Sequence, residues 1–265
     1  MPSLEARSIW FRYSRVDGYV LRGAELYASP GDAVAIVGPM GSGKTTLLMI
    51  LAGLLNPEKG VVRLGDTVVT GGGPGARQMV GIVFQDPDEQ LFNPTVYDEL
   101  AYALRTMGLG EDEIRERVRM VAESLGIKDL LGRPPHRLSY GQKKLVALAS
   151  VLVYEPYLLL LDEPTTNLDK ESFEKVLGLI NKYRNENRIV VITTHDIDTV
   201  IRASTKLCVL SNGVLECSNT WEVLGKGLDA LPVPVPISLE VLLQREGSWE
   251  KVAVMLRRII EGQSY

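Results

Sequence analysis

GPMGSGKT, residues 38–45, is the most informative octet of this chain. It has the complete G-x-x-x-x-G-K-[ST] pattern of a phosphate-binding loop, between an apolar strand-like run (32–37) and a helical pattern that begins with 47–55. Glycines allow such a loop to curl, so that successive main-chain N–H groups point inward at phosphate oxygens. The strand–loop–helix order therefore predicts a nucleotide site at the N-terminal end of a helix.

Two side chains of this loop have specific chemistry. Lys44 can reach the β- and γ-phosphates, and the Thr45 hydroxyl can ligate Mg²⁺. A chance glycine-rich turn is the alternative, and about one chain in a hundred would contain such an octet by accident. The predicted nucleotide-binding residues of the loop are Gly38, Pro39, Met40, Gly41, Ser42, Gly43, Lys44, Thr45 and Thr46.

Composition narrows the class of protein. The chain has 265 residues, of which 45% are hydrophobic and 23% charged, as in ordinary soluble globular proteins. A net charge of −4 provides no general basic field for nucleic acid. No apolar run approaches the ~20 residues that span a bilayer, and the start MPSLEARSIW lacks the basic and apolar regions of a signal peptide.

The pattern of strands and helices predicts an α/β core with a helical subdomain. Residues 1–37 alternate as strands, and a hairpin follows around Gly65-Asp66. GGGPG (71–75) is expected to be a flexible loop, and PVPVPIS (232–238) extended rather than helical. Further strands are expected at 79–84, 157–161 and 188–194, and helices across 95–128, 141–153 and 170–187. The helical subdomain is expected at roughly 95–155. A C-terminal appendage after 238 is expected to contain one or two helices.

The two cysteines lie in the last predicted strand pair. Cys208 and Cys217 are nine residues apart on either side of an Asn212-Gly213 turn, so they could face each other. Two reduced, packed thiols in a cytosolic protein are the favoured interpretation.

LLLLDE, residues 158–163, resembles the second half of a nucleotide site. Asp162 ends a buried strand, where a carboxylate is costly unless it faces a cation or hydrogen-bond donors. The loop-bound Mg²⁺ would be that cation. Glu163 would point toward the γ-phosphate and polarise an attacking water, a role typically worth ~10²–10⁴-fold in rate. The alternative is that Glu163 caps the turn that follows.

Other polar side chains follow strands at the same expected sheet edge. His195 ends the strand 188–194 and is a candidate γ-phosphate contact, whereas His136 is interpreted as structural. Gln85 follows the strand 79–84, where its carbonyl can reach Mg²⁺ or a bound water. Ser139 and Gly141 open a helix whose N-terminus forms a second anion site, although, taken alone, this segment is better explained as a simple helix cap.

In this order, the motifs resemble those of an ATP-binding-cassette (ABC) ATPase over residues 3–225. GPMGSGKT resembles the Walker A motif, Gln85 the Q-loop, LSYGQ the signature, LLLLDE the Walker B motif, NLD (167–169) the D-loop and His195 the switch histidine. The resemblance implies a P-loop cassette with an antiparallel β subdomain and an α-helical subdomain. It implies that Tyr13 stacks on adenine, and that Ser139, Gly141 and Gln142 bind the ATP of a partner subunit.

A finer resemblance lies in FQDPDEQLFNPTVYDELAYAL (84–104), which looks like the ATPase subunits of energy-coupling-factor importers of cobalt, nickel or vitamins. It implies ATP hydrolysis with Mg²⁺ at the cytoplasmic face of the membrane. It also implies a second ATPase subunit, identical or different, a transmembrane scaffold, a small substrate-binding membrane protein, and no nucleic acid. Leu91, Phe92, Val96 and Tyr97 are expected to line a groove for a helix of a membrane subunit. The alternative is that these residues only pack the helical subdomain.

Some residues depart from the family pattern. Tyr140 replaces the usual glycine of the signature, Leu145 a usual arginine, and Asn167 a small residue. Three alternatives remain open: another class of ABC transporter, a soluble ABC ATPase of DNA repair or translation, and a non-hydrolysing regulator. The division expected is an ATPase domain at 1–228 and a C-terminal extension at 229–265.

Overall fold

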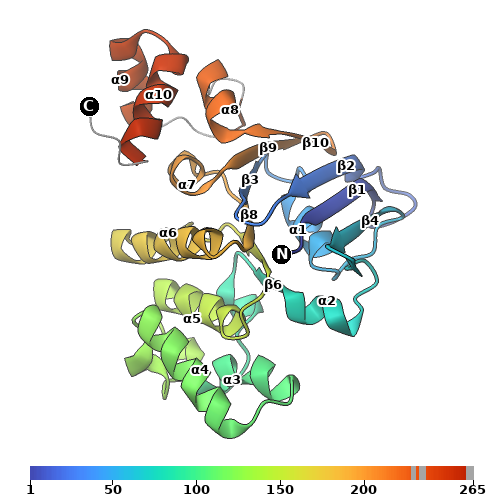
Figure 1. The fold of residues 1–265 in the computed structure, drawn as a ribbon, viewed down its shortest axis with the longest axis vertical. Helices are drawn as coiled ribbons and strands as arrows, with labels where there is room; N and C mark the ends of the chain where they lie inside the picture. The colour runs from blue at the N-terminus through green and yellow to red at the C-terminus, as the bar shows by residue number, and fades with distance from the viewer. Residues whose placement is uncertain (228–230, 233–236, 261–265) are drawn as a thin grey trace.

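The computed structural model of the chain describes residues 1–227, 231–232 and 237–260. It confirms the predicted α/β class, with an antiparallel sheet and a helical part beside a mostly parallel sheet (Figure 1). In Figure 1 the antiparallel sheet lies to the right, the helices α3–α5 at the bottom and the C-terminal helices at the top.

The central sheet has six strands in the order β10-β9-β3-β8-β7-β6. Its pairings are parallel except for the β9–β10 hairpin. Every residue of β3, β7 and β8 is buried, which explains why these strands are continuously apolar in sequence. The strands are β3 (Ala33–Val37), β6 (Val80–Val83), β7 (Leu158–Asp162), β8 (Ile189–Thr193), β9 (Lys206–Ser211) and β10 (Val214–Asn219).

The second sheet is antiparallel, in the order β2-β1-β4-β5. One face is buried against α1 (Lys44–Leu51), where Leu4 and Ile9 join a core with Leu47 and Leu48. This core holds the phosphate loop between the two sheets. The strands are β1 (Leu4–Phe11), β2 (Leu21–Ala28), β4 (Lys59–Leu64) and β5 (Thr67–Val68).

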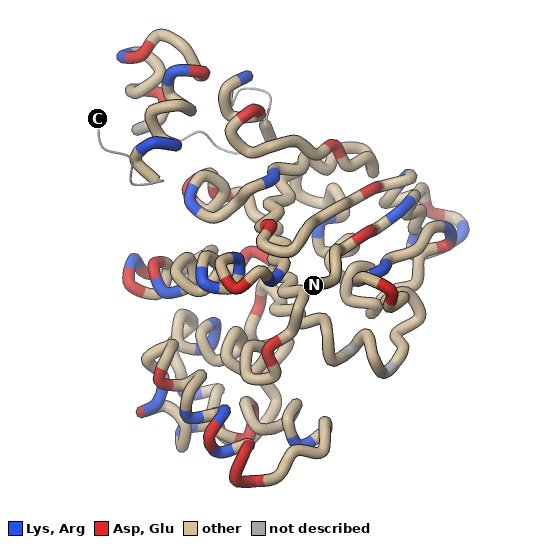
Figure 2. The backbone as a smooth tube through the Cα atoms, in the orientation of Figure 1, with Lys and Arg blue, Asp and Glu red and all other residues tan. Residues whose placement is uncertain are grey.

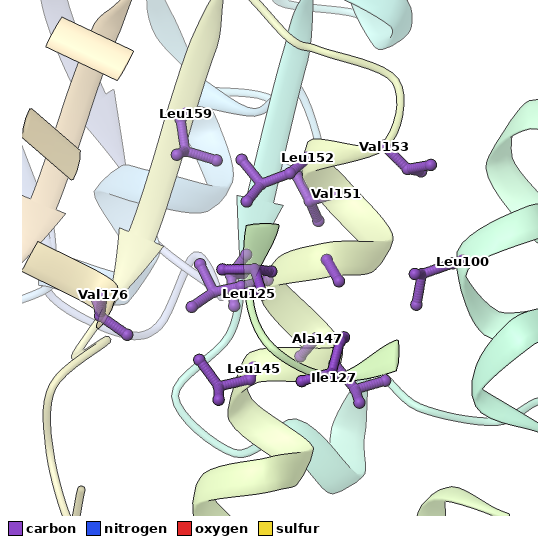
Figure 3. Close-up of a cluster of buried hydrophobic side chains, with 14 of the residues drawn as sticks. Leu100, Leu125, Ile127, Leu145, Ala147, Val151, Leu152, Val153, Leu159 and Val176 are labelled. Carbon is purple, nitrogen blue, oxygen red and sulfur yellow. The ribbon is translucent and has the colours of Figure 1, made fainter. Parts of the chain in front are cut away.

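The helical part has its own apolar core. Figure 3 shows Leu100 facing α5 across a cluster that includes Ala147 and Val151, and this cluster continues to Leu159 of the central sheet. The apolar spacing that predicted helices over 95–128 and 141–153 thus marks the faces that meet here. The elements are η1 (Pro87–Glu89), α3 (Val96–Thr106), α4 (Glu111–Ser124), η2 (Lys128–Leu130), η3 (Pro135–Arg137) and α5 (Tyr140–Leu152), followed after β7 by α6 (Lys170–Asn185).

The C-terminal helices pack on α7 (Ile197–Ala203) through a third apolar cluster. This cluster includes Leu224 of α8 (Thr220–Lys226), Leu239 of α9 (Ile237–Glu246) and Ala253 of α10 (Trp249–Ile260). Among the described residues, no helix is both long and apolar enough to cross a membrane.

The outer helices carry both basic and acidic residues. Figure 2 shows basic and acidic segments interspersed on α4 and α6. On α4, Arg119 pairs with Glu116 at 2.6 Å and with Glu123 at 3.0 Å. These are exposed pairs one turn apart, so they favour a solvated helix face.

Two predicted loop conformations need correction. A short helix, α2 (Pro74–Met79), begins within the predicted flexible loop 71–75. Proline has the φ of a helix and lacks only an N–H that is unused at the first helical position, so Pro74 can start a helix. Of the predicted extended segment 232–238, residues 233–236 lie outside the described residues, whereas Ile237 and Ser238 open α9.

The prediction of two reduced cysteines is wrong for this structure. Cys208 and Cys217 form a disulfide, with an S–S distance of 2.07 Å. Asn212 and Gly213 both have positive φ, as a two-residue hairpin turn requires, and the resulting register pairs Cys208 directly with Cys217. The turn therefore decides that these thiols meet across β9 and β10.

Candidate active site

The phosphate loop connects β3 to α1 as predicted. Gly41 and Gly43 have φ values of +76° and +101°, in the left-handed region that favours glycine. A Cβ on Gly43 would also lie 2.7 Å from a methyl group of Val20. Both the main-chain conformation and the packing therefore require glycine at position 43.

The polar groups of the loop point to an anion. The Lys44 ammonium donates to the carbonyl oxygens of Gly38 at 2.8 Å and Pro39 at 3.1 Å, so it lies folded over the loop. The Ser42 hydroxyl is buried and has no hydrogen-bond partner in the described part of the chain. A cation, a hydroxyl donor and a helix N-terminus at one place fit the phosphates of a nucleotide.

Tyr13 lies beside the same helix. Its hydroxyl is 2.9 Å from that of Thr46, and its ring, 62% exposed, meets Phe11 edge to face. An exposed aromatic ring next to a phosphate loop suits contact with a nucleobase. Pro39 and Met40 are also exposed, whereas Thr46 is buried.

Asp162 is buried at the end of β7 and is held by two hydroxyls. Thr45 donates to one carboxylate oxygen at 2.6 Å, and Thr193 donates to the other. Thr193 comes to this place because the parallel register sets it beside Asp162. These two hydrogen bonds offset the free-energy cost of burying the carboxylate.

A cavity of about 270 Å³ lies next to this carboxylate. Thr45, Gln85, Asp162 and Tyr140 are among its lining residues. Hydroxyl, amide carbonyl and carboxylate oxygens are the donors that Mg²⁺ prefers. The residues present therefore fit a magnesium ion.

Glu163 follows Asp162, and each polar group of Glu163 has a contact within the chain. Its Oε1 is 2.8 Å from Nδ1 of His195, and its Oε2 accepts from the hydroxyl of Thr166 at 3.1 Å. Its main-chain N–H donates to the carbonyl of Thr193 at 3.1 Å. The residue has a φ of +46°, which turns the side chain out of the strand direction. His195 is half-exposed, so its ring lies between the carboxylate and solvent.

Lys144 is a site residue that the sequence analysis missed. Its side chain is buried on α5, and its ammonium donates to the main-chain oxygen of Glu163. Burial lowers the pKa of Lys144 to about 8, against the opposing effect of Glu163 and Asp162. The available signal was a lysine immediately before the apolar run LVALASVL (145–152), but its target, a carbonyl 19 residues away, is visible only in the fold.

The signature segment forms the N-terminus of α5. Ser139 accepts from the main-chain N–H of Gln142 at 3.3 Å, and the Gln142 side chain accepts from the N–H of Ser139 at 3.1 Å. This is a complete capping box, as the alternative interpretation expected. Ser139 is nevertheless exposed, and Gly141 follows it on the same first turn.

Tyr140 is directed toward the chain's own Q-loop. Its hydroxyl donates to the carbonyl of Gln85 at 3.2 Å. Burial, with the nearby Asp86 and Asp88, raises the pKa of Tyr140 above its ordinary value. The bulky side chain is thus tied to the same chain rather than projecting from it.

The predicted site residues fall into two groups. Those from the phosphate loop, β6, β7 and β8 gather at the carboxyl ends of the parallel strands, where α/β sheets bind ligands. Ser139 and Gln142 form their hydrogen bonds with each other on α5. His136 lies exposed in η3, outside both groups.

Known proteins are similar to this chain in sequence and in fold. The model of the ABC transporter family matches residues 21–166. An ABC transporter ATP-binding protein of Methanothermobacter marburgensis is 38% identical over 255 residues, which cover 93% of this chain and 91% of that protein. The energy-coupling factor transporter ATP-binding protein EcfA of Methanothermobacter thermautotrophicus is 39% identical over 217 residues, 78% of this chain and 68% of that protein.

A solved structure is also similar to this chain. That of cbiO1 from Clostridium perfringens, part of the ABC transporter complex cbiONQ, has a TM-score of 0.73 and 36% identity, covering 83% of this chain and 89% of that one. The family match and the relatives that span most of the chain are consistent with the phosphate loop, the buried Asp162 and the adjacent Glu163. The chain belongs to the ABC transporter family and is an ATPase of the ATP-binding-cassette type.

Proposed function

We propose that this chain is the ATP-hydrolysing subunit of an energy-coupling-factor type importer of a metal ion or a vitamin. The observation that carries the proposal is the similarity to both EcfA and cbiO1 over about four fifths of the chain. In this proposal the chain binds peripherally at the cytoplasmic face of a membrane, as one of two ATPase subunits beneath a transmembrane scaffold and a small substrate-binding membrane protein. Residues 1–228 would be the ATPase domain and 229–265 a C-terminal extension.

The phosphate loop would hold the ATP phosphates. Main-chain N–H groups from 38–46 and the Lys44 ammonium would contact them, and the Ser42 hydroxyl would gain the partner that it lacks. Tyr13 would stack on adenine. Thr45, Gln85 and Asp162 would hold Mg²⁺, which when bound neutralises phosphate charge.

Glu163 would act as the general base. A water attacks the γ-phosphorus while its proton passes to the carboxylate, and the bond from phosphorus to the bridging oxygen of ADP breaks. His195 and Thr166 each hold one carboxylate oxygen of Glu163, which leaves the group little rotational freedom. These contacts therefore promote the reaction by orienting the carboxylate of Glu163 rather than through one strong interaction with a single residue.

A second subunit would complete the site. Ser139, Gly141 and Gln142 lie on an exposed helix N-terminus, which is an anion site in its own right. They would bind the γ-phosphate of the ATP held by the partner, and the partner's signature would do the same here. The partner subunit would be a second copy of this chain or a related cassette.

The predicted groove for a membrane subunit needs one correction. Val96 is fully buried in the core, and Leu91 and Tyr97 pack against that core. Phe92 and Tyr102 are instead 68% and 51% exposed, with ring centroids 5.1 Å apart. We propose that this aromatic pair, which follows the Q-loop in sequence, contacts a helix of the scaffold subunit.

Recovery of the membrane complex tests the proposal. The tagged chain would be expressed in its native host and isolated from solubilised membranes, and the proteins that accompany it would be identified by mass spectrometry. A scaffold and a small substrate-binding membrane protein are the expected partners. Phe92→Asp should remove them, whereas Val214→Asp, an exposed residue on the β9–β10 hairpin, should retain them. Recovery of a different transporter class, or of no membrane protein, would contradict the proposal.

A further inference from the structure

One face of α5 lies along the Q-loop. Tyr140, Lys143, Ala147 and Ser150 follow one another at intervals of three or four residues, so they share a helix face. Tyr140 binds the carbonyl of Gln85, and the Lys143 ammonium is 2.6 Å from Asp88. The Gln90 amide donates to the carbonyl of Ala147 at 3.2 Å and to the Ser150 hydroxyl at 3.3 Å.

The Q-loop segment is also ordered within itself. The side chain of Asp86 accepts from the N–H of Asp88, which caps η1. The Gln90 side chain accepts from the N–H of Phe84 at 3.2 Å, so the segment closes on its own beginning. Residues 84–90 and α5 are therefore joined as one unit by side-chain contacts at both ends of the segment.

Of these contacts, the one made by Tyr140 is next to the catalytic residues. Tyr140 lines the same cavity as Thr45, Gln85 and Asp162. Its ring centroid is also 5.8 Å from the ammonium of Lys144, which binds the main chain of Glu163. The N-terminal part of α5 thus contacts both the Q-loop, through Tyr140, and the loop of the general base, through Lys144.

We infer that Tyr140 is a positioning residue of the chain's own ATP site. Its hydroxyl, bound to the main chain of Gln85, keeps the Gln85 side chain at the cavity beside Thr45 and Asp162. The inference rests on the proposed role of Gln85 at Mg²⁺.

Hydrogen exchange in the nucleotide-free chain tests the contact directly. Tyr140→Phe removes only the hydroxyl and keeps the ring. Amide exchange in a peptide covering residues 84–90 should accelerate about three- to tenfold, the effect of losing one net hydrogen bond. Tyr157→Phe makes the same change at a half-exposed tyrosine elsewhere on the molecule and should leave this peptide unchanged. Wild-type exchange rates in Tyr140→Phe would overturn the inference.

Kinetics test whether the contact acts through Gln85. Tyr140→Phe should lower kcat about three- to tenfold, with KM for ATP within about twofold, since the phosphate loop is untouched. In a Gln85→Ala background the same substitution should have almost no further effect. An undiminished loss of kcat in that background would overturn the inference. A wild-type chain without ATPase activity would contradict the proposed function instead, and the exchange comparison would still decide the role of Tyr140.

Discussion

Glu163 illustrates how much of the site depends on single side chains. Its carboxylate is bound by His195 and Thr166, its N–H by Thr193 and its carbonyl by Lys144. Of these four neighbours, Lys144 lies in α5 and Thr193 in β8, and the other two lie in the loops that follow β7 and β8. A residue held at every polar group has a defined orientation before any substrate arrives, which is the form of preorganisation that lowers a barrier.

Removal of the Glu163 charge should separate binding from hydrolysis. In Glu163→Gln the side chain keeps its shape but cannot accept the proton of the attacking water, so steady-state phosphate release should fall below about a tenth of the wild-type rate. ATP binding should persist, because the phosphate loop is unchanged. Glu171→Gln on the exposed start of α6 is the control and should retain full activity. Turnover above a tenth of the wild-type rate would contradict the assignment.

Lys44 should matter for binding itself. Its ammonium lies over the loop on the carbonyls of Gly38 and Pro39, where a phosphate would compete for it. Lys44→Ala should weaken the affinity for a fluorescent ATP analogue at least about tenfold, the effect of losing a charge-assisted hydrogen bond. Lys59→Ala, at the exposed start of β4, should bind as the parent does. Equal affinities of the Lys44 variant and the parent would argue against phosphate contact.

At the scale of elements, the β9–β10 hairpin carries the one cross-link in the described chain. β9 pairs in parallel with β3, the strand that leads into the phosphate loop, and Cys208 stands beside Ile36. The disulfide therefore joins the edge strand β10 to β9, which is the neighbour of β3 in the sheet. Its closed loop is short, so the stabilisation expected from restricting the unfolded chain is about 2–3 kcal/mol.

Thiol labelling under denaturing conditions checks this hairpin. Without reductant, alkylation should leave both cysteines unmodified, and after reduction both should react. In urea titrations the reduced chain should be less stable by about 2–3 kcal/mol. A Cys208→Ser, Cys217→Ser double variant should show no such dependence on reductant. Two labelled thiols in the unreduced protein would show that the pair is not cross-linked in solution.

At the scale of the whole molecule, the proposed function makes the nucleotide site half of a larger one. The phosphate loop would cover one side of a γ-phosphate, and the signature at the start of α5, where Ser139 is exposed, would bind the phosphate of another subunit's ATP. Only a ligand that interacts differently with the open and closed pair can shift the association equilibrium. ATP has the γ-phosphate that would bridge the subunits, and ADP does not.

Association should therefore depend on the nucleotide. Glu163→Gln with Mg²⁺ and ATP should form a dimer in size-exclusion chromatography with light scattering, because blocked hydrolysis holds the pair closed. With ADP the same protein should remain monomeric. Adding Ser139→Arg should prevent the dimer, since it places a bulky side chain at the exposed signature. A monomer in ATP would exclude self-pairing and favour a different cassette as partner.

The local motifs could be predicted from the sequence because their chemistry is contiguous. The phosphate loop, the strand ending in Asp162-Glu163 and the capped start of α5 each depend on neighbours within a few residues. The order of strands and helices also predicted the α/β class and the helical part. Errors arose where a short segment had two plausible states, as in the α2 helix, and at Val96, whose burial depends on a distant core.

The sequence by itself determined the fold class, the family and most candidate residues, because these follow from local patterns in a fixed order. Only the tertiary structure decided which side chains meet across the sheet and between helices. The bonds from Thr193 to Asp162, Lys144 to Glu163 and Tyr140 to Gln85 join residues 19 to 55 positions apart. Such contacts depend on strand register and helix packing, which no local pattern specifies. Cys208 and Cys217 differ from these pairs: the local Asn212-Gly213 turn sets them opposite each other, and the structure adds that the two thiols are bonded.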